Sequence, residues 1–151
     1  IDTVLKDPHT GTMGIVAICL TLIVKVCLLH ALLGSQTLVT SGLFIALVWS
    51  RFLAVVYILA TPYARETGAS AGLRINGYRY FIIIMGLVLV VSTVFVTTLA
   101  FVLALVSTLG VWLLWWRHQW IKKIGGYTGD CVGALIEIAE LATLLVAVLV
   151  L

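Results

Sequence analysis

Charged residues are scarce in this chain of 151 residues: Asp, Glu, Lys and Arg together make up 10%, whereas 63% of the residues are hydrophobic. Soluble globular domains are nearer half apolar and a quarter charged. A globule of this length cannot bury so large an apolar fraction in its interior. The composition therefore excludes an ordinary soluble enzyme and a disordered tail, and it indicates that lipid surrounds most of the chain.

Other familiar signatures are also missing. The three cysteines form no CxxC or other close pair, which excludes a disulfide-stapled secreted domain, and we expect them to pack as small hydrophobic residues. There is no Walker A, HExxH or GxSxG pattern, and His9, His30 and His118 have no partner at metal-ligand spacing. A net charge of +3 is too small to indicate a nucleic-acid partner. Any chemistry must therefore come from carboxylates, basic residues and glycines.

Long apolar runs are what the sequence does contain. About 20 apolar residues in helical conformation cross a bilayer, so these runs predict an all-α, polytopic bundle of about five transmembrane helices, forming one domain over residues 1–151. The uncharged run 80–116 would be about 55 Å long as a single helix, which is too long for one span. We therefore place a turn near Thr97–Thr98, although neither glycine nor proline marks it. The expected spans are about 13–33, 37–60, 80–96, 99–116 and 131–151.

The basic residues outside these spans all fall on one side of the predicted bundle. Five spans place residues 1–12, 61–79 and 117–130 on the same side, and the positive-inside rule makes that side cytoplasmic. We therefore expect a multi-pass protein of the cytoplasmic (inner) membrane, whose glycine-rich and acidic segments form an active face toward the cytoplasm. The seven basic residues are Lys6, Arg65, Arg74, Arg79, Arg117, Lys122 and Lys123.

Four charged residues, Lys25, Arg51, Glu137 and Glu140, lie within the apolar spans. A charged side chain at the bilayer centre costs about 2.5–3.5 kcal/mol on insertion scales, so each should face the bundle or a wet cavity. The helical rise places all four at comparable depth. Two interpretations remain open: a buried cluster of ion pairs that fixes helix register, or a set of residues that serves a functional site.

The segment GGYTGDCVGALIEIAE, residues 125–140, carries the clearest pattern. Thr128 is suited to be an N-cap, which places Asp130 in the first helical turn. Asp130 and Glu137 share one stripe of the helix because seven residues make nearly two turns. Carboxylates on one face beneath a glycine turn suit a hard cation such as Mg²⁺. The alternative is a capped helix start whose carboxylates pair with the two cations of the other spans.

Two further polar segments open on the same side. LKDPHTGTMG, residues 5–14, offers Lys6, Asp7 and two glycines beside a helix N-terminus, whose free N–H groups favour phosphate oxygens. YARETG, residues 63–68, contains Arg65, the side-chain type best shaped to bind a phosphate through two hydrogen bonds. The coincidence favours a shared site for a phosphate-bearing substrate.

At these three segments the chain resembles the integral-membrane cobalamin synthases, also called adenosylcobinamide-GDP ribazoletransferases. The resemblance is carried by GGYTGDCVGALIEIAE, by KDPHTGTMG before the span that contains Lys25, and by WSR, residues 49–51, followed by YARETG. Their order and spacing agree with the C-terminal part of that family, a little over half of a typical member. The sequence departs from the family pattern at His9, where arginine is usual, and it lacks the Asp-rich DGLADxxDG-like motif found upstream.

The resemblance implies a Mg²⁺-dependent transferase of cobalamin (vitamin B12) biosynthesis. Its substrates would be adenosylcobinamide-GDP and α-ribazole, or α-ribazole 5′-phosphate, and GMP would be released. Because the upstream motif does not occur here, we expect residues 1–151 alone to be inactive. The implied catalytic residues and metal ligands are Asp130, Glu137 and Asp7, and the implied phosphate contacts are Lys6, Arg51, Arg65 and Lys25.

Two other functions compete with this interpretation. The intramembrane charges could form the relay of a small transporter or proton-conducting subunit. Alternatively, the chain could be a non-catalytic assembly bundle whose charges only pair. The sequence leaves the oligomeric state open, and the partners that it indicates are the two substrates and the lipid bilayer.

Overall fold

The computed structural model describes residues 12–34, 36–64 and 78–151, which form an all-α structure. The predicted fold class is confirmed, because each helix in this part of the chain is long and apolar enough to cross a membrane. The division of residues 1–151 as a single domain stays a prediction. The five helices of the described residues are α1 (Thr12–Ala31), α2 (Gln36–Ala60), α3 (Tyr78–Val96), α4 (Leu99–Ile124) and α5 (Gly129–Val150).

The helix boundaries lie close to the predicted spans except at the end of α4. This helix continues to Ile124, well beyond the predicted end at residue 116. No glycine or proline lies between residue 116 and Gly125, which takes a left-handed conformation with φ of 78° and ends the helix. Residues 117–124, which were predicted to follow the span, thus continue α4 as helix, and only residues 125–128 separate α4 from α5.

The predicted turn between α3 and α4 is confirmed, and threonines make it. Thr97 donates its hydroxyl hydrogen bond to the carbonyl oxygen of Thr93 at 2.7 Å, where α3 ends. Thr98 is the N-cap of α4, and its hydroxyl oxygen accepts a hydrogen bond from the backbone N–H of Phe101 at 3.2 Å. A threonine cap thus replaces the glycine or proline that usually marks such a turn.

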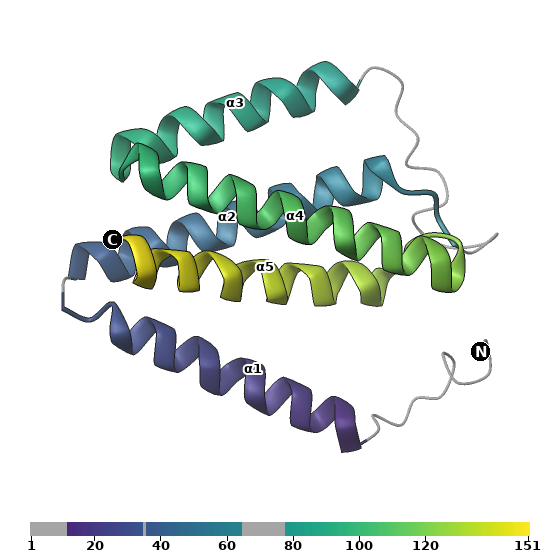
Figure 1. Cartoon of the computed structure of the whole chain (residues 1–151), viewed down its shortest axis with the longest axis horizontal. Coiled ribbons are helices and arrows are strands. Elements are labelled where there is room, and N and C mark those ends of the chain that lie inside the picture. The colour runs from purple at the N-terminus through teal and green to yellow at the C-terminus, as the bar shows by residue number, and fades with distance from the viewer. Residues whose placement is uncertain (1–11, 35, 65–77) are drawn as a thin grey trace.

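The helices run alternately up and down, with α5 in the middle of the bundle (Figure 1). α5 packs most extensively against α2 and also contacts α4 and α1, whereas α1 and α3 lie at the outside. The beginnings of α1, α3 and α5 and the ends of α2 and α4 lie at one end of the molecule. We call this the junction end, because the connection between α4 and α5 lies there.

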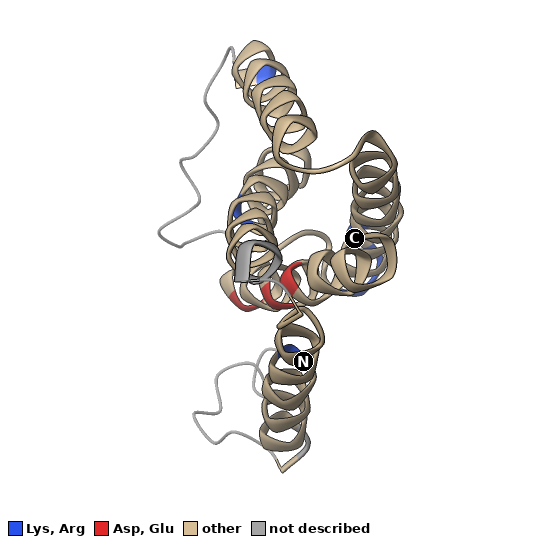
Figure 2. Cartoon of the chain, turned by 90° about the vertical axis from the view of Figure 1, so that its left-hand side faces the viewer, with Lys and Arg blue, Asp and Glu red and all other residues tan. Residues whose placement is uncertain are grey.

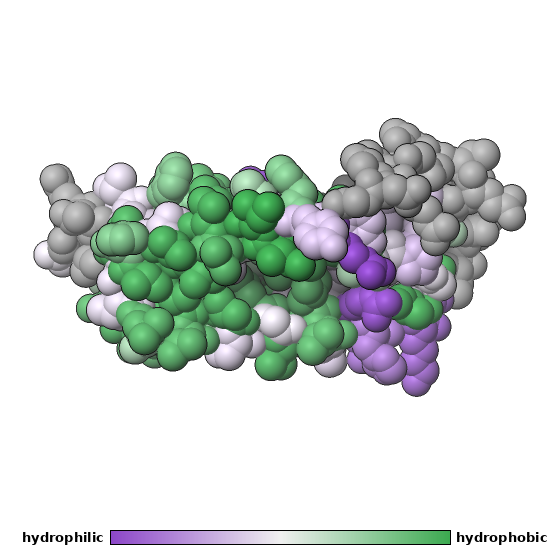
Figure 3. Space-filling model, turned by 90° about the horizontal axis from the view of Figure 1, so that it is seen from above, coloured by the Kyte–Doolittle hydropathy of each residue, from purple (hydrophilic) through white to green (hydrophobic). Residues whose placement is uncertain are grey.

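The face seen in Figure 3 is apolar over most of its length, and its polar residues gather at the junction end. Large hydrophobic side chains are exposed along α1 and α3, including Ile18, Val26, Phe81 and Leu87. A soluble protein would not expose so continuous an apolar face. The arrangement supports a multi-pass membrane protein, with the helices crossing the bilayer side by side.

Candidate functional site

The connection between α4 and α5 is a short glycine turn that starts α5 in a defined direction. The backbone N–H of Gly125 donates to the carbonyl oxygen of Ile121 at 2.9 Å and ends α4. Thr128 caps α5, because its hydroxyl oxygen accepts from the backbone N–H of Cys131 at 3.5 Å. The predicted N-cap is confirmed, and Asp130 lies in the first turn as expected.

This turn is joined to the chain that leaves α2. The backbone N–H of Tyr127 donates to the carbonyl oxygen of Pro62 at 3.0 Å, and that of Ala64 donates to the carbonyl oxygen of Tyr127 at 3.1 Å. Tyr63 and Tyr127 thereby form a parallel bridge, with their ring centres 5.2 Å apart. A Cβ at Gly126 would lie 2.2 Å from the oxygen of Pro62, so the approach requires glycine.

The contact brings together the beginnings of two of the three polar segments singled out in the sequence. Residues 63 and 64 open the segment YARETG, and residues 125–128 open the segment that contains Asp130. Arg65 follows in the sequence but lies outside the described residues, as do Lys6 and Asp7. The part that is described therefore supports a shared site at the junction end.

A basic side chain of α4 strengthens the same junction. Arg117 donates from Nε to the carbonyl oxygen of Ala60 at 3.1 Å, at the last residue of α2. Such a cation satisfies a carbonyl group that the helix end leaves without a partner. The sequence indicated only a topological role for Arg117, and this contact could not be found by a local pattern because α2 and α4 are distant in the chain.

Asp130 is exposed at the start of α5. Within the described part of the chain, it has no ion-pair or hydrogen-bond partner. In that same part, no group of three or more His, Cys, Asp and Glu residues lies close enough to hold a metal ion. The Mg²⁺ site predicted from Asp130, Glu137 and Asp7 thus stays a prediction.

The charges within the spans pair with one another. The Lys25 ammonium donates to Glu137 Oε2 at 2.9 Å and to Glu140 Oε2 at 2.7 Å, while Arg51 Nη1 donates to Glu140 Oε1. We call Lys25, Arg51, Glu137 and Glu140 the four-charge cluster. Figure 2 views the bundle along its helices and shows the acidic residues on α5 beside α1 and α2.

The four-charge cluster matches the ion-pair interpretation of these residues. Glu140 is 5% exposed, and both of its carboxylate oxygens accept hydrogen bonds from cations. The cluster holds two positive and two negative groups, so its formal charge is zero. The predicted roles of Lys25 and Arg51 on phosphate, and of Glu137 on metal, stay predictions, but each side chain already has a partner here.

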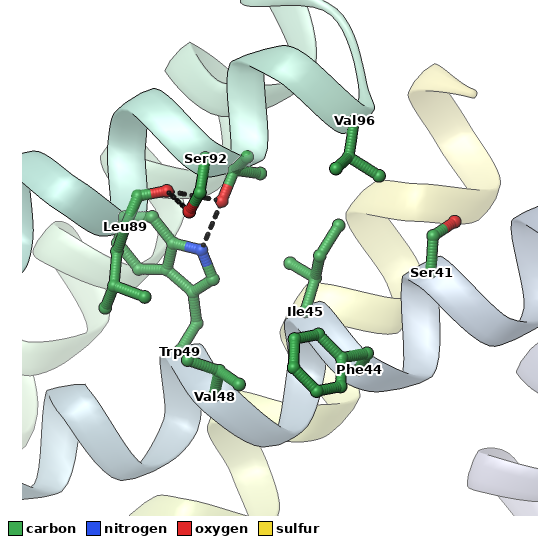
Figure 4. A pocket seen from close by; sticks show the side chains of 9 residues that line it. Ser41, Phe44, Ile45, Val48, Trp49, Leu89, Ser92 and Val96 are labelled. Atoms are coloured by element: carbon green, nitrogen blue, oxygen red, sulfur yellow. Dashed lines mark hydrogen bonds between the residues drawn. The ribbon is translucent and has the colours of Figure 1, made fainter.

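Two other residues of this region, Trp49 and Ser50, were noted in the sequence only as part of the WSR motif. Ser50 accepts a hydrogen bond from Arg51 Nη1 at 2.9 Å and donates one to Glu140 Oε1 at 3.4 Å. Trp49 donates from its indole N–H to the hydroxyl oxygen of Thr93 at 3.0 Å, and both residues line a cavity of about 110 Å³ between α2 and α3 (Figure 4). Their place in WSR, next to Arg51, is the one signal that could have suggested them.

Comparison with known proteins supports the resemblance seen in the sequence. A family model described as cobalamin-5-phosphate synthase matches residues 1–148. A protein named adenosylcobinamide-GDP ribazoletransferase from Alkalilimnicola ehrlichii is 39% identical over 144 residues, which are 94% of this chain and 54% of the relative. The protein of the same name from Pseudomonas syringae pv. tomato is 33% identical over 144 residues, covering 94% of this chain and 57% of the relative. The chain thus spans a little over half the length of these relatives, and no solved structure matches it.

Proposed function

Because the chain belongs to the cobalamin-5-phosphate synthase family, we propose that it takes part in joining adenosylcobinamide-GDP to α-ribazole, or to α-ribazole 5′-phosphate, with release of GMP. The reaction would belong to cobalamin biosynthesis and would take place at the membrane. The observation that carries the proposal is the pairing of residues 62–64 with residues 126–127 at the junction end. This pairing joins two polar segments beside the exposed Asp130.

The proposed reaction exchanges one phosphorus–oxygen bond for another. A hydroxyl oxygen of the ribazole bonds to the phosphorus that carries the cobinamide, the anhydride bond to the second phosphorus breaks, and GMP leaves with the bridging oxygen. The hydroxyl proton passes to a base or to water. Such a transfer needs positioning and neutralisation of phosphate charge rather than a covalent protein intermediate.

Asp130 fits a metal ligand better than the other described carboxylates do. It is exposed and lacks a partner within the described residues, and carboxylate oxygens are preferred ligands of Mg²⁺. Glu137 shares one oxygen with Lys25, so a metal ion would compete with that cation. We propose that Asp130 holds Mg²⁺ together with Asp7 and Glu137. The ion, when bound, would neutralise charge on the pyrophosphate oxygens.

We propose Lys6 and Arg65 as the principal phosphate contacts. Lys6 precedes α1 in the sequence, and Arg65 directly follows Ala64 of the junction end. The guanidinium of arginine is well shaped to bind phosphate. Lys25 and Arg51, also predicted for this role, are about 20 Å and 14 Å from the junction ends of their helices by helical rise. Because Lys25 and Arg51 already pair with Glu140, we propose that they contact phosphate only secondarily.

We propose that the junction end faces the cytoplasm of a cell with an inner membrane. Arg79, Arg117, Lys122 and Lys123 lie near this end. Among the described residues, the connections at the opposite end contain no lysine or arginine. The positive-inside rule favours this orientation.

The activity is tested on the protein as its gene encodes it, in membranes, by measuring GMP release from adenosylcobinamide-GDP with α-ribazole and Mg²⁺. We expect Asp130→Asn to lower the rate at least about 100-fold, because the neutral amide is a weaker ligand for the metal ion that would neutralise phosphate charge. Ser107→Ala, on an exposed face of α4, is the control and should keep the wild-type rate.

Two outcomes would contradict the proposal. Absence of GMP release by the wild-type protein would overturn the function. A wild-type rate in Asp130→Asn, with the same amount of protein in the membrane, would overturn the assigned site but leave the function intact.

A further inference from the structure

Glu137 of the four-charge cluster is a charged residue that the described bundle only half covers. Its side chain is 51% exposed, and its one ion-pair partner among the described residues is Lys25 on α1. By helical rise Glu137 lies about 12 Å from the start of α5, well inside a hydrocarbon core about 30 Å thick. The described helices therefore leave half of a charged side chain uncovered at a depth where lipid surrounds the bundle.

Lipid is an unsuitable neighbour for this side chain. Charged residues within transmembrane helices face other protein or a water-filled cavity, because contact with acyl chains is costly. A glutamate side chain is also too short to reach the polar surface of the bilayer from that depth, as the longer side chains of lysine and arginine do near helix ends. Protein or water must therefore cover the exposed side of Glu137.

An exposed face of α5 extends from Glu137 to the junction end. Asp130, Gly133, Ala134 and Glu137 are all exposed, and intervals of three and four residues place them on one side of the helix. A Cβ at Gly133 would meet nothing within 4 Å. We call these four residues the open face of α5, because elsewhere α5 packs in the middle of the bundle.

The path of α1 leaves the open face uncovered. α1 and α2 follow one another in the chain, but among the described helices α1 makes substantial contact with α5 and not with α2. Toward the junction end α1 diverges from α5 (Figure 1), and Lys25 is the residue that reaches across to Glu137. The open face therefore lies beside α1 without being buried by it.

The open face has the composition of a helix-packing surface. Small residues at such intervals allow the backbones of two transmembrane helices to approach closely. The face extends for about two helical turns along the axis of α5, as a contact with a second helix would. A water-filled cavity needs no small residues, so their place beside Glu137 favours protein as the cover.

The charge of the cluster indicates what this protein segment carries. Lys25, Arg51, Glu137 and Glu140 have a formal charge of zero, and a further charge at that depth would leave the cluster unbalanced. An uncharged polar side chain would give Glu137 a hydrogen bond without this cost. The chain spans a little over half the length of its relatives, so proteins of this family have further polypeptide that could supply the segment.

We propose that the open face of α5 is an interface within the intact protein, and that a transmembrane helix from outside residues 1–151 packs on it. This helix contacts Gly133 and Ala134 closely and presents an uncharged polar side chain to Glu137, a serine, threonine, asparagine or glutamine. The interface does not depend on the proposed transferase function.

The first test compares two glycines of the intact protein in phosphatidylcholine nanodiscs without substrates. We expect Gly133→Leu to lower the midpoint of thermal unfolding by about 5 °C, because the larger side chain occupies the space of the second helix. Gly110→Leu on α4 is the matched control, since a Cβ at either glycine meets nothing within 4 Å in the described structure. Gly110→Leu should unfold as the wild type does, and equal midpoints in the two variants would overturn the proposal.

The second test identifies the cover directly and does not need Gly133→Leu to fold. Ala134 is replaced by the photo-reactive residue p-benzoylphenylalanine in the intact protein, which is irradiated in membranes, and the adduct is mapped by mass spectrometry. We expect a link within one polypeptide to a peptide outside residues 1–151.

Every other adduct would overturn the proposal. A link to phospholipid would show that lipid covers the face, and no adduct would indicate water. A product of twice the mass would assign the face to a second copy, and a link to residues 1–11 or 65–77 would assign it to this chain itself. Absence of GMP release would overturn the transferase function but would not affect either test.

Discussion

Glu140 is the most constrained charged residue of the described chain. It is 5% exposed, and its oxygens accept from Lys25, Arg51 and Ser50 on two other helices. Glu137 lies one turn away on α5, but its side chain is 51% exposed and, among the described residues, Lys25 is its one ion-pair partner. Two carboxylates that look equivalent in the sequence therefore have different surroundings.

This difference predicts unequal losses of stability. Glu140→Gln leaves two cations without their shared carboxylate within the bundle, and breaking a buried ion pair from one side costs about 3 kcal/mol or more. Glu137→Gln removes a half-exposed partner while Lys25 keeps Glu140, so we expect about 0–1 kcal/mol. The measurement is SDS-induced unfolding in mixed micelles, followed by circular dichroism. Equal losses in the two variants would show that Glu140 does not connect the helices as described.

At the scale of elements, the junction end depends on two backbone hydrogen bonds and one glycine. Gly126 cannot take a side chain without moving Pro62, because the added Cβ would approach its carbonyl oxygen to 2.2 Å. The connection after α2 and the start of α5 would then separate. Any site that uses both segments would lose its geometry.

Gly126→Ala is therefore expected to lower both the thermal stability and the GMP release of the intact protein. We expect at least a tenfold loss of rate, because small displacements of positioned groups are costly in catalysis. Gly110→Ala is the control, since a Cβ at Gly110 on α4 meets nothing within 4 Å. Wild-type stability in Gly126→Ala would mean that the Tyr63–Tyr127 bridge is dispensable.

The attachment of α1 is a second feature of this scale. Among the described helices, α5 is the one with which α1 makes substantial contact. No residue in the span of α1 is buried inside the described structure. Leu32, just after the helix, is buried against the core. Lys25 therefore supplies the polar connection between α1 and the rest of the bundle.

Lys25→Met should loosen α1 while α2 and α5 stay together, because Arg51 still pairs with Glu140. We expect a broader distance distribution between spin labels at Val26 on α1 and Leu145 on α5, measured by pulsed EPR in nanodiscs. Lys25→Arg keeps the charge and should preserve the narrow distribution. An unchanged distribution in Lys25→Met would show that apolar contacts alone hold α1.

At the scale of the whole molecule, the bundle separates two regions of polar residues. One region is the junction end, where backbone pairing positions Asp130. The other is the four-charge cluster, which connects α1, α2 and α5 within the span. The first region suits chemistry on phosphate, and the second region suits orientation of the helices. The sequence had assigned residues of both regions to a single site.

Local features of the chain were predictable from the sequence. The spans, the division near Thr97, the cap at Thr128 and the position of Asp130 all follow from apolar length and from the preferences of single residues, which act over a few neighbours. The end of α4 was missed because the charged residues after Trp116 indicated the end of the span, although no residue between Trp116 and Gly125 breaks the helix. The family was also recognisable, since its motifs are short and contiguous.

The partners of the charged residues were decided by the tertiary structure. Whether Glu140 or Glu137 is buried, and whether Arg51 pairs with a carboxylate, depends on how α1, α2 and α5 pack, which no local pattern contains. The pairing of Tyr63 with Tyr127 likewise joins residues that are far apart in the chain and close only after folding. Hydropathy and capping are properties of neighbouring residues, so the sequence by itself determined the helices. Contacts between distant residues depend on the packed arrangement of all the helices, and that arrangement alone decided which side chains meet.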